Sequence, residues 1–159
     1  MLCFAITGIS RHNWDIKNGM SSAKPGNMQK KTCLLVDDDE DDKEIFALAL
    51  REANPSIQCF IASNGLEALS MLKAGTFIPD YVFLDLNMPI MSGKECLAEI
   101  RKQPHLLHVP IIIFSTSSSE KDIQDTQALG ASSFITKPPL IATLAEKLTE
   151  VFETEYGRT

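Results

Sequence analysis

The stretch CLLVDDD at residues 33–39, together with VFLD at residues 82–85, decides the fold class. Each stretch is a short apolar run of strand composition that ends abruptly in carboxylates. Parallel strands place their carboxyl ends along one edge of a sheet, where the ligand sites of open α/β folds form. Aspartates at two such ends would form a cluster of like charges, which is costly unless a cation fills it. Because hard oxygen ligands suit Mg²⁺, the two stretches predict a small acidic magnesium pocket.

Short apolar runs alternate with amphipathic segments five times from Thr32 onward. The expected strands are Cys33–Val36, Ile57–Ala62, Tyr81–Leu84, Ile111–Phe114 and Phe134–Thr136. The expected helices begin at Asp41 or Asp42, after Asn64-Gly65, after Ser92, at about Glu120 and at Leu140, the last running to about Phe152. Five such units predict a doubly wound parallel sheet with helices on both faces.

Composition excludes several classes of protein. A chain of 159 residues is expected to form one domain, and its net charge of -6, without a Lys/Arg-rich run, argues against direct nucleic-acid binding. Its 44% hydrophobic and 23% charged residues are typical of a soluble globular protein. The four cysteines (Cys3, Cys33, Cys59 and Cys96) are widely separated, which favours reduced thiols in a cytoplasmic protein over disulfides or zinc.

The first thirty-one residues differ from the rest of the chain. Residues 1–31 have no helical or strand periodicity, so we interpret them as a disordered arm or as a mis-assigned start, with Met28 opening the domain. A signal peptide is a third option, although the apolar run at residues 2–6 is too short to span a membrane. The domain is then expected at 32–153, followed by a tail at 154–159.

Five motifs occur in an order and spacing that resemble a known family. They are LLVDD at residues 34–38, FLDLNMP at 83–89, Ser115, Phe134 and Lys137-Pro138. Over about residues 32–153 the chain is similar to a response-regulator receiver domain, the phosphoacceptor part of two-component signalling systems. The resemblance implies a flavodoxin-like doubly wound sheet of five parallel strands, in the order 2-1-3-4-5, with five helices. It also implies a phosphorelay switch and not an enzyme in the metabolic sense. Because the five units fill the chain from Thr32 onward, we expect a stand-alone receiver without an effector domain.

The resemblance assigns roles to the acidic strand ends. Asp85 is the expected phosphoacceptor, and a carboxylate is a competent nucleophile towards phosphorus. Asp38 is expected to bind Mg²⁺ directly and Asp37 to help, largely through water, while Asp85 and the backbone carbonyl of Asn87 complete the metal site. Lys137 is the expected cation for the transferred phosphoryl group. The family's Lys-Pro bond is usually cis, and a cis bond before Pro138 would aim Lys137 inward.

Two further residues are expected to form the switch. Ser115 follows the fourth strand and matches the family's switch hydroxyl, although the serine-rich run leaves Thr116 as an alternative. Phe134 matches the family's rotating aromatic residue, and an ordinary core phenylalanine is the competing interpretation.

Other polar residues are given structural roles. Four acids at residues 39–42 are read as the solvated amino end of a helix, which favours negative charge. His105 and His108 flank a proline-bounded loop without a third ligand, so we interpret them as solvated loop residues.

Three functions stay open at this level. The first is a response regulator phosphorylated by a sensor histidine kinase or phosphotransfer protein, acting on a downstream protein, with no membrane contact. Single receivers of this sort resemble those paired with separate sensors, including bacteriophytochromes, and homodimerisation on phosphorylation is an open alternative. The second function is a degenerate receiver used as a binding module. The third is an aspartyl-phosphate-type phosphohydrolase, which is disfavoured because Asn87 replaces the second aspartate that such enzymes use as a general acid.

Overall fold

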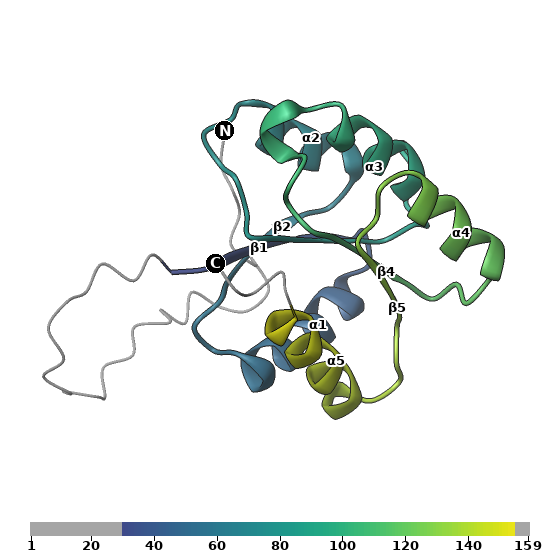
Figure 1. Ribbon diagram of the computed structural model, residues 1–159. Helices are drawn as coiled ribbons and strands as arrows, with labels where there is room; N and C mark the ends of the chain where they lie inside the picture. Colours follow the sequence, from purple (N-terminus) through teal and green to yellow (C-terminus); the bar gives the residue numbers. More distant parts are fainter. Residues whose placement is uncertain (1–29, 155–159) are drawn as a thin grey trace, which may run out of the picture.

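Five parallel strands form the centre of the molecule (Figure 1). The computed structural model describes residues 30–154. The strands are β1 (Thr32–Val36), β2 (Gln58–Ala62), β3 (Tyr81–Leu84), β4 (Ile111–Ser115) and β5 (Ser133–Thr136). Their order in the sheet is β2-β1-β3-β4-β5, which confirms the predicted doubly wound, flavodoxin-like topology. The residues of the predicted N-terminal arm up to position 29, and most of the predicted tail, lie outside the described residues.

Helices cover both faces of the sheet. The helices are α1 (Glu40–Ala53), α2 (Gly65–Lys73), α3 (Gly93–Arg101), α4 (Glu120–Ala128) and α5 (Ile141–Glu153). As Figure 1 shows, α2, α3 and α4 lie on one face of the sheet, and α1 and α5 lie on the other. Within residues 30–154, no helix combines the length and apolar character needed to cross a bilayer.

The strands are buried on both faces, and their side chains alternate between two core layers. In β1, Leu34 and Val36 pack in the layer of α2 and α3, while Cys33 and Leu35 pack in the layer of α1 and α5. Phe46 of α1 stands edge-on to the rings of two strand phenylalanines, with centroid distances of 4.9 and 5.5 Å. This two-sided burial explains why the strands read as continuous apolar runs in the sequence.

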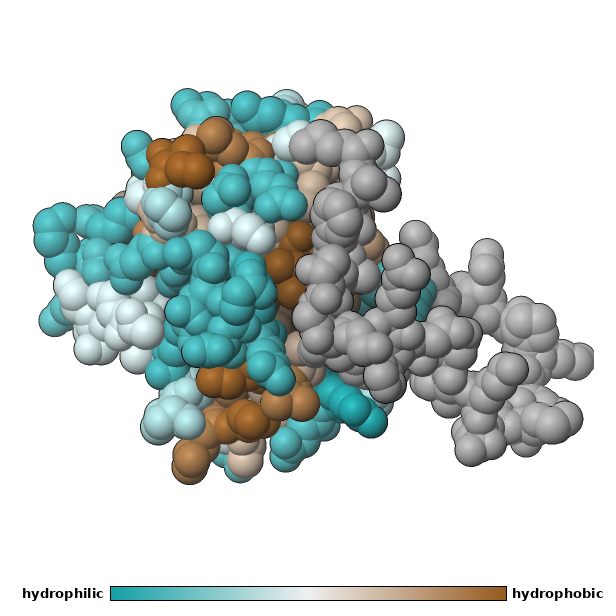
Figure 2. Space-filling model, turned by 180° about the vertical axis from the view of Figure 1, so that it is seen from behind, coloured by the Kyte–Doolittle hydropathy of each residue, from teal (hydrophilic) through white to brown (hydrophobic). Residues whose placement is uncertain are grey.

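Apolar side chains are scarcer on the surface than in the two core layers. Figure 2 shows one face on which hydrophilic residues separate smaller apolar areas. The large apolar side chains that stay exposed are Leu48, Leu66, Ile78, Ile90, Leu107, Ile123, Leu129 and Leu140. Among the cysteines, Cys33, Cys59 and Cys96 are free thiols, and Cys3 lies outside the described residues.

Short polar side chains set where the helices begin. Asp39 caps α1 by accepting a hydrogen bond from the Asp42 N–H at 3.0 Å, so the helix begins at Glu40, one or two residues earlier than predicted. Ser92 and Glu95 form a reciprocal capping box on α3, as the sequence indicates for Ser92.

The loop before β4 holds a short 3-10 helix, η1 (Pro104–Leu106), that the sequence analysis did not predict. His105 within it is half-buried, and its Nε2 lies 3.0 Å from the carbonyl oxygen of Leu72. The prediction of a solvated loop residue is therefore wrong for His105, because the turn packs its ring against the end of α2. His108 is exposed.

Candidate functional site

Strand register brings two aspartates to one edge of the sheet. Val36 pairs with Leu84, so the residues that follow them, Asp37 and Asp85, leave the sheet side by side. The Asp85 N–H donates to the Val36 carbonyl at 2.9 Å and holds this arrangement. Asp37 is 0% and Asp85 4% exposed, whereas the neighbouring Asp38 is exposed. One carboxylate oxygen from each of these three aspartates lies within 4.8 Å of the others.

Lys137 directly follows β5, an edge strand of the sheet, and its side chain extends into this pocket. Its Nζ lies 2.7 Å from Asp37 Oδ2 and 3.6 Å from Asp85 Oδ1, and its side chain is only 9% exposed. The Lys137 N–H donates to the Ser115 carbonyl at 2.8 Å, which continues the pairing of β5 with β4 by one residue. The backbone therefore delivers the ammonium group to the carboxyl edge of the sheet.

The predicted cis bond before Pro138 is wrong. None of the peptide bonds among residues 30–154 is cis. The hydrogen bond from the Lys137 backbone to β4 and the ion pairs of its ammonium group direct the side chain inward, so a trans bond is compatible with this orientation.

Asp42 is a site residue that the sequence analysis missed. Its Oδ2 lies 2.6 Å from Lys137 Nζ, so it shares the ammonium group with Asp37. The interpretation of residues 39–42 as solvated acids holds for Asp39, which caps α1, but not for Asp42, whose side chain is 29% exposed. The sequence feature that could have indicated Asp42 is its position in the first turn of a helix that begins directly after the pocket aspartates.

Burial dominates the electrostatics of the pocket. It raises the pKa of Asp85 to about 6, against the opposing attraction of Lys137, and the nearby charge of Asp37 adds to the rise. Burial also raises the pKa of Asp37, although a hydrogen bond from Lys137 opposes that shift. Burial lowers the pKa of Lys137, but its hydrogen bonds to Asp37 and Asp42 outweigh this, so the net shift is upward. The pocket is thus short of positive charge, and its clustered carboxylate oxygens fit a divalent cation such as Mg²⁺.

Asn87, a predicted metal ligand through its carbonyl, belongs to the loop after β3 and is exposed. Its backbone N–H donates to the Asp85 carboxylate and thereby favours the ionised form. The role of its carbonyl oxygen stays a prediction.

Ser115 ends β4 and is fully buried, whereas Thr116 is exposed. The Ser115 Oγ accepts a hydrogen bond from the Ser117 N–H at 3.2 Å. Phe134 lies on β5 opposite Ile113 of β4 and is half-buried against the core layer of α2 and α3. The burial of Ser115 and the exposure of Thr116 favour Ser115 as the predicted switch residue.

Comparison with known proteins identifies the family. Residues 33–149 match the model of the response regulator receiver domain. The chain belongs to the response regulator receiver family. Receiver domains are the phosphoacceptor modules of two-component signalling; they take phosphoryl groups from histidine kinases or phosphotransfer proteins and bind Mg²⁺ or Mn²⁺ in an acidic pocket.

Individual relatives agree with this assignment. The receiver domain is 40% identical over 92 residues to chemotaxis protein CheY-3 of Vibrio cholerae, covering 58% of this chain and 69% of that protein. It is 31% identical over 112 residues to response regulator Rcp1 of Synechocystis, covering 67% of this chain and 76% of that protein. Among solved structures, the phosphorylated cyanobacterial phytochrome response regulator RcpA aligns with a TM-score of 0.74 and 29% identity, over 82% of this chain and 97% of that one. The Mn²⁺-bound form of Rcp1 aligns with a TM-score of 0.70 and 26% identity, over 81% and 96%.

Proposed function

We propose that this domain is a response regulator that accepts a phosphoryl group on Asp85 and then switches a protein-interaction surface. The observation that carries the proposal is a nearly buried carboxylate at a strand end, beside two further aspartates and a lysine. A pKa of about 6 leaves Asp85 ionised at neutral pH and also a stronger base than an ordinary aspartate. Both properties suit a nucleophile.

The transfer follows from the positions of these groups. A carboxylate oxygen of Asp85 attacks the phosphorus of a phosphohistidine, a new P–O bond forms, and the P–N bond breaks. The electron pair of the broken bond goes to the imidazole nitrogen. Lys137, with its ammonium group 3.6 Å from Asp85 Oδ1, neutralises charge on the transferred group. Asp37, Asp38 and Asp85 would hold Mg²⁺, which when bound neutralises the phosphoryl oxygens.

The switch begins at Ser115. Because its Oγ accepts a hydrogen bond from Ser117, its own hydroxyl hydrogen is available to donate to a phosphoryl oxygen. Such a bond would draw the loop between β4 and α4 towards Asp85. Phe134, on the neighbouring strand and half-buried, is proposed to follow this movement and alter the surface of β5.

A separate sensor histidine kinase or phosphotransfer protein is the proposed donor, with an unidentified protein as the target and the cytoplasm as the compartment. The sensor histidine kinase CheAY of Helicobacter pylori is 34% identical over 105 residues, a stretch that is 13% of its own length. A structural neighbour, response regulator RPA3017 of R. palustris, is described as acting in red light signaling and is 26% identical. These relatives support phosphorelay function without choosing a sensor.

The decisive test is intact-mass measurement after incubation with acetyl phosphate and Mg²⁺. We expect one phosphoryl adduct on the wild-type chain, dependent on Mg²⁺, and none on Asp85→Asn. Asp41→Asn removes an exposed acid from the same region and should react like wild type. An adduct that persists in Asp85→Asn would refute the assignment of the site. A wild-type chain that binds Mg²⁺ but gains no adduct would favour the degenerate binding module instead.

A further inference from the structure

Helix α4 is held to the rest of the molecule by very little apolar contact. Of its nine residues only Thr126 is buried, and none belongs to either core layer. The Thr126 hydroxyl is used inside the helix, where it donates to the Asp122 carbonyl at 2.7 Å. The position of α4 therefore depends on polar contacts to a greater extent than that of the other helices.

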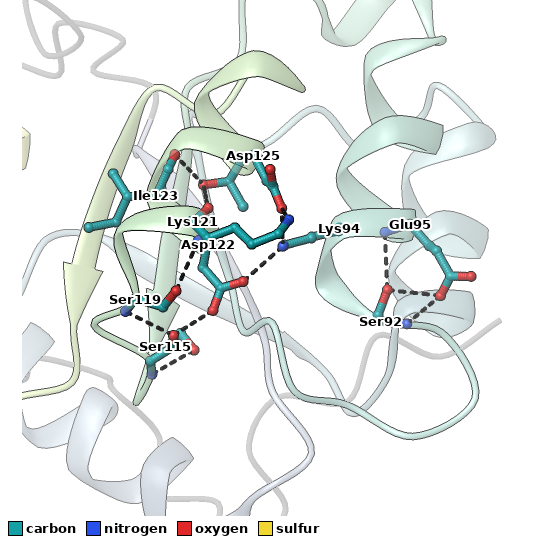
Figure 3. Close-up of polar contacts among 11 residues, drawn as sticks. Ser92, Lys94, Glu95, Ser115, Ser119, Lys121, Asp122, Ile123 and Asp125 are labelled. Carbon is teal, nitrogen blue, oxygen red and sulfur yellow. Dashed lines mark hydrogen bonds and ion pairs between the residues drawn. The ribbon is translucent and has the colours of Figure 1, made fainter.

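One lysine supplies most of these polar contacts. Lys94, the second residue of α3, places its Nζ 2.8 Å from Asp122 Oδ1 and 2.7 Å from Asp125 Oδ2, both on α4 (Figure 3). Hydrogen bonds to these two aspartates raise the pKa of Lys94. The pKa of Asp122 is lowered by Lys94 and then by Ser117, which shows that this aspartate has partners on two sides.

Asp122 also joins the loop that carries Ser115. The Ser117 hydroxyl donates to Asp122 Oδ2 at 2.5 Å, and the Ser117 N–H donates to Ser115 Oγ at 3.2 Å. In Figure 3 these contacts form one continuous series from α3 through α4 to the end of β4. The side chain of Lys94 is thus connected to Ser115 through two intermediate residues.

The other end of the series is fixed to the phosphoacceptor. Gly93, immediately before Lys94, donates its N–H to the Leu86 carbonyl at 3.0 Å. A Cβ at position 93 would lie 2.1 Å from the Asp85 carbonyl oxygen, so only glycine allows this close packing of α3 on the loop after β3. Lys94 therefore directly follows a residue that packs against the backbone of Asp85.

We propose that Lys94 is a positioning residue, a latch from α3 to α4 that holds the β4–α4 loop and must loosen when Ser115 turns towards a phosphoryl group on Asp85. The inference rests on the proposed function, because it concerns the cost of that movement. A shift of Ser115 displaces Ser117, which weakens the Ser117–Asp122 bond and changes how Asp122 meets Lys94. The Lys94 contacts thereby oppose phosphorylation, and their loosening changes the position of α4.

Lys94→Met tests the latch, and Lys121→Met is its matched control. Lys121 also contacts Asp125, at 2.7 Å, but it lies within α4 itself. Its replacement therefore changes the net charge equally and leaves the contacts between α3 and α4 in place. The test compares two quantities: the rate of adduct formation with acetyl phosphate and Mg²⁺, and the rate of amide hydrogen exchange over residues 116–126. We expect Lys94→Met to form the adduct about threefold faster, equivalent to about 0.65 kcal/mol, with faster exchange in that segment. Lys121→Met should match wild type, and Lys94→Arg should stay close to it.

The possible outcomes distinguish the role of Lys94 from the phosphorylation of Asp85. If Lys94→Met exchanges faster but forms the adduct at the wild-type rate or more slowly, Lys94 is a structural tie and the latch is refuted. An equal acceleration in Lys121→Met would assign the effect to net charge and also refute it. A wild-type chain that forms no adduct would overturn the proposed function itself, and the latch with it.

Discussion

Two lysines in this molecule each pair with two or more aspartates, yet the pKa values of the aspartates shift in opposite directions in the two clusters. In the pocket, Lys137 lies 2.7 Å from Asp37, and at the α3–α4 contact Lys94 lies 2.7 Å from Asp125. Burial raises the pKa of Asp37 despite this contact, and it raises the pKa of Asp85, 3.6 Å from the same ammonium group, to about 6. Hydrogen bonds from Lys121 and then Lys94 lower the pKa of Asp125 to about 2. The sign of the shift is therefore not set by the distance to the nearest ammonium group.

Burial and charge balance account for the difference. The Asp37 and Asp85 side chains are 0% and 6% exposed, whereas the Asp122 and Asp125 side chains are 28% and 36% exposed. Among residues 30–154, Lys137 is the one lysine paired with Asp37, Asp42 and Asp85. Lys94 pairs with Asp122 and Asp125, and Lys121 adds a second cation at Asp125. A buried excess of carboxylates is destabilising until a cation joins it, and an exposed balanced set is not. The same pair of residue types thus builds a buried acidic pocket in one place and a helix contact in the other.

Removal of the pocket lysine should give the largest effect. In metal-free buffer at neutral pH, Lys137→Met should lower the free energy of unfolding by about 3 kcal/mol, because it leaves buried carboxylates without their cation. Lys94→Met should cost far less, since its partners stay hydrated. Urea denaturation followed by circular dichroism measures both. Equal losses for the two variants would show that burial does not distinguish the clusters.

Removal of the pocket charge should act in the opposite direction. Because the folded-state pKa of Asp85 is about 6 and its unfolded value about 3.9, ionisation costs the folded state about 2–3 kcal/mol above pH 7. Asp85→Asn should therefore be more stable than the metal-free wild type at pH 7.5 by up to about that amount. The advantage should disappear as the pH falls from about 6 to about 4, where the folded wild type takes up the proton first.

Asp125 supplies the contrast for this pH series. Its pKa is depressed in the folded state, so its contribution to stability is present above the unfolded pKa and is lost as the pH falls through about 2. Asp125→Asn should therefore differ from wild type by a constant amount between pH 5 and 7. If its difference changed over that range as that of Asp85→Asn does, the opposite signs of the two shifts would be wrong.

Asp42 should give the smallest of these effects. Asp42→Asn removes the closest contact of Lys137 and frees its ammonium group for the phosphoryl group, so adduct formation should be about two- to fivefold faster, as expected for a partly exposed ion pair. Rates with acetyl phosphate and Mg²⁺ measure this, with Asp41→Asn as the control for loss of one charge in the same helical turn. A slower reaction would mean that Asp42 orients Lys137 productively and does not compete for it.

The strands could be predicted from the sequence because a strand that is buried on both faces is a continuous apolar run. The apolar runs located every strand to within two residues, and Asp37 and Asp85 stood where runs stopped. Helix starts were less accurate at α1, where Asp39 supplies the cap. The packing of His105 on α2 and the trans bond before Pro138 were missed, because neither has a local pattern that distinguishes it.

The sequence by itself determined that carboxylates would end two buried strands and that a lysine would follow a third, since strand burial and its interruption are local properties. Only the tertiary structure decided which carboxylates share which lysine. Asp42 and Lys137 are 95 residues apart, and Lys94 and Asp125 are 31 apart. Their contacts depend on where α1, α3 and α4 settle against the sheet. An ion pair needs its nitrogen and oxygen within about 4 Å of each other. The close packing of the whole core sets where such atoms lie.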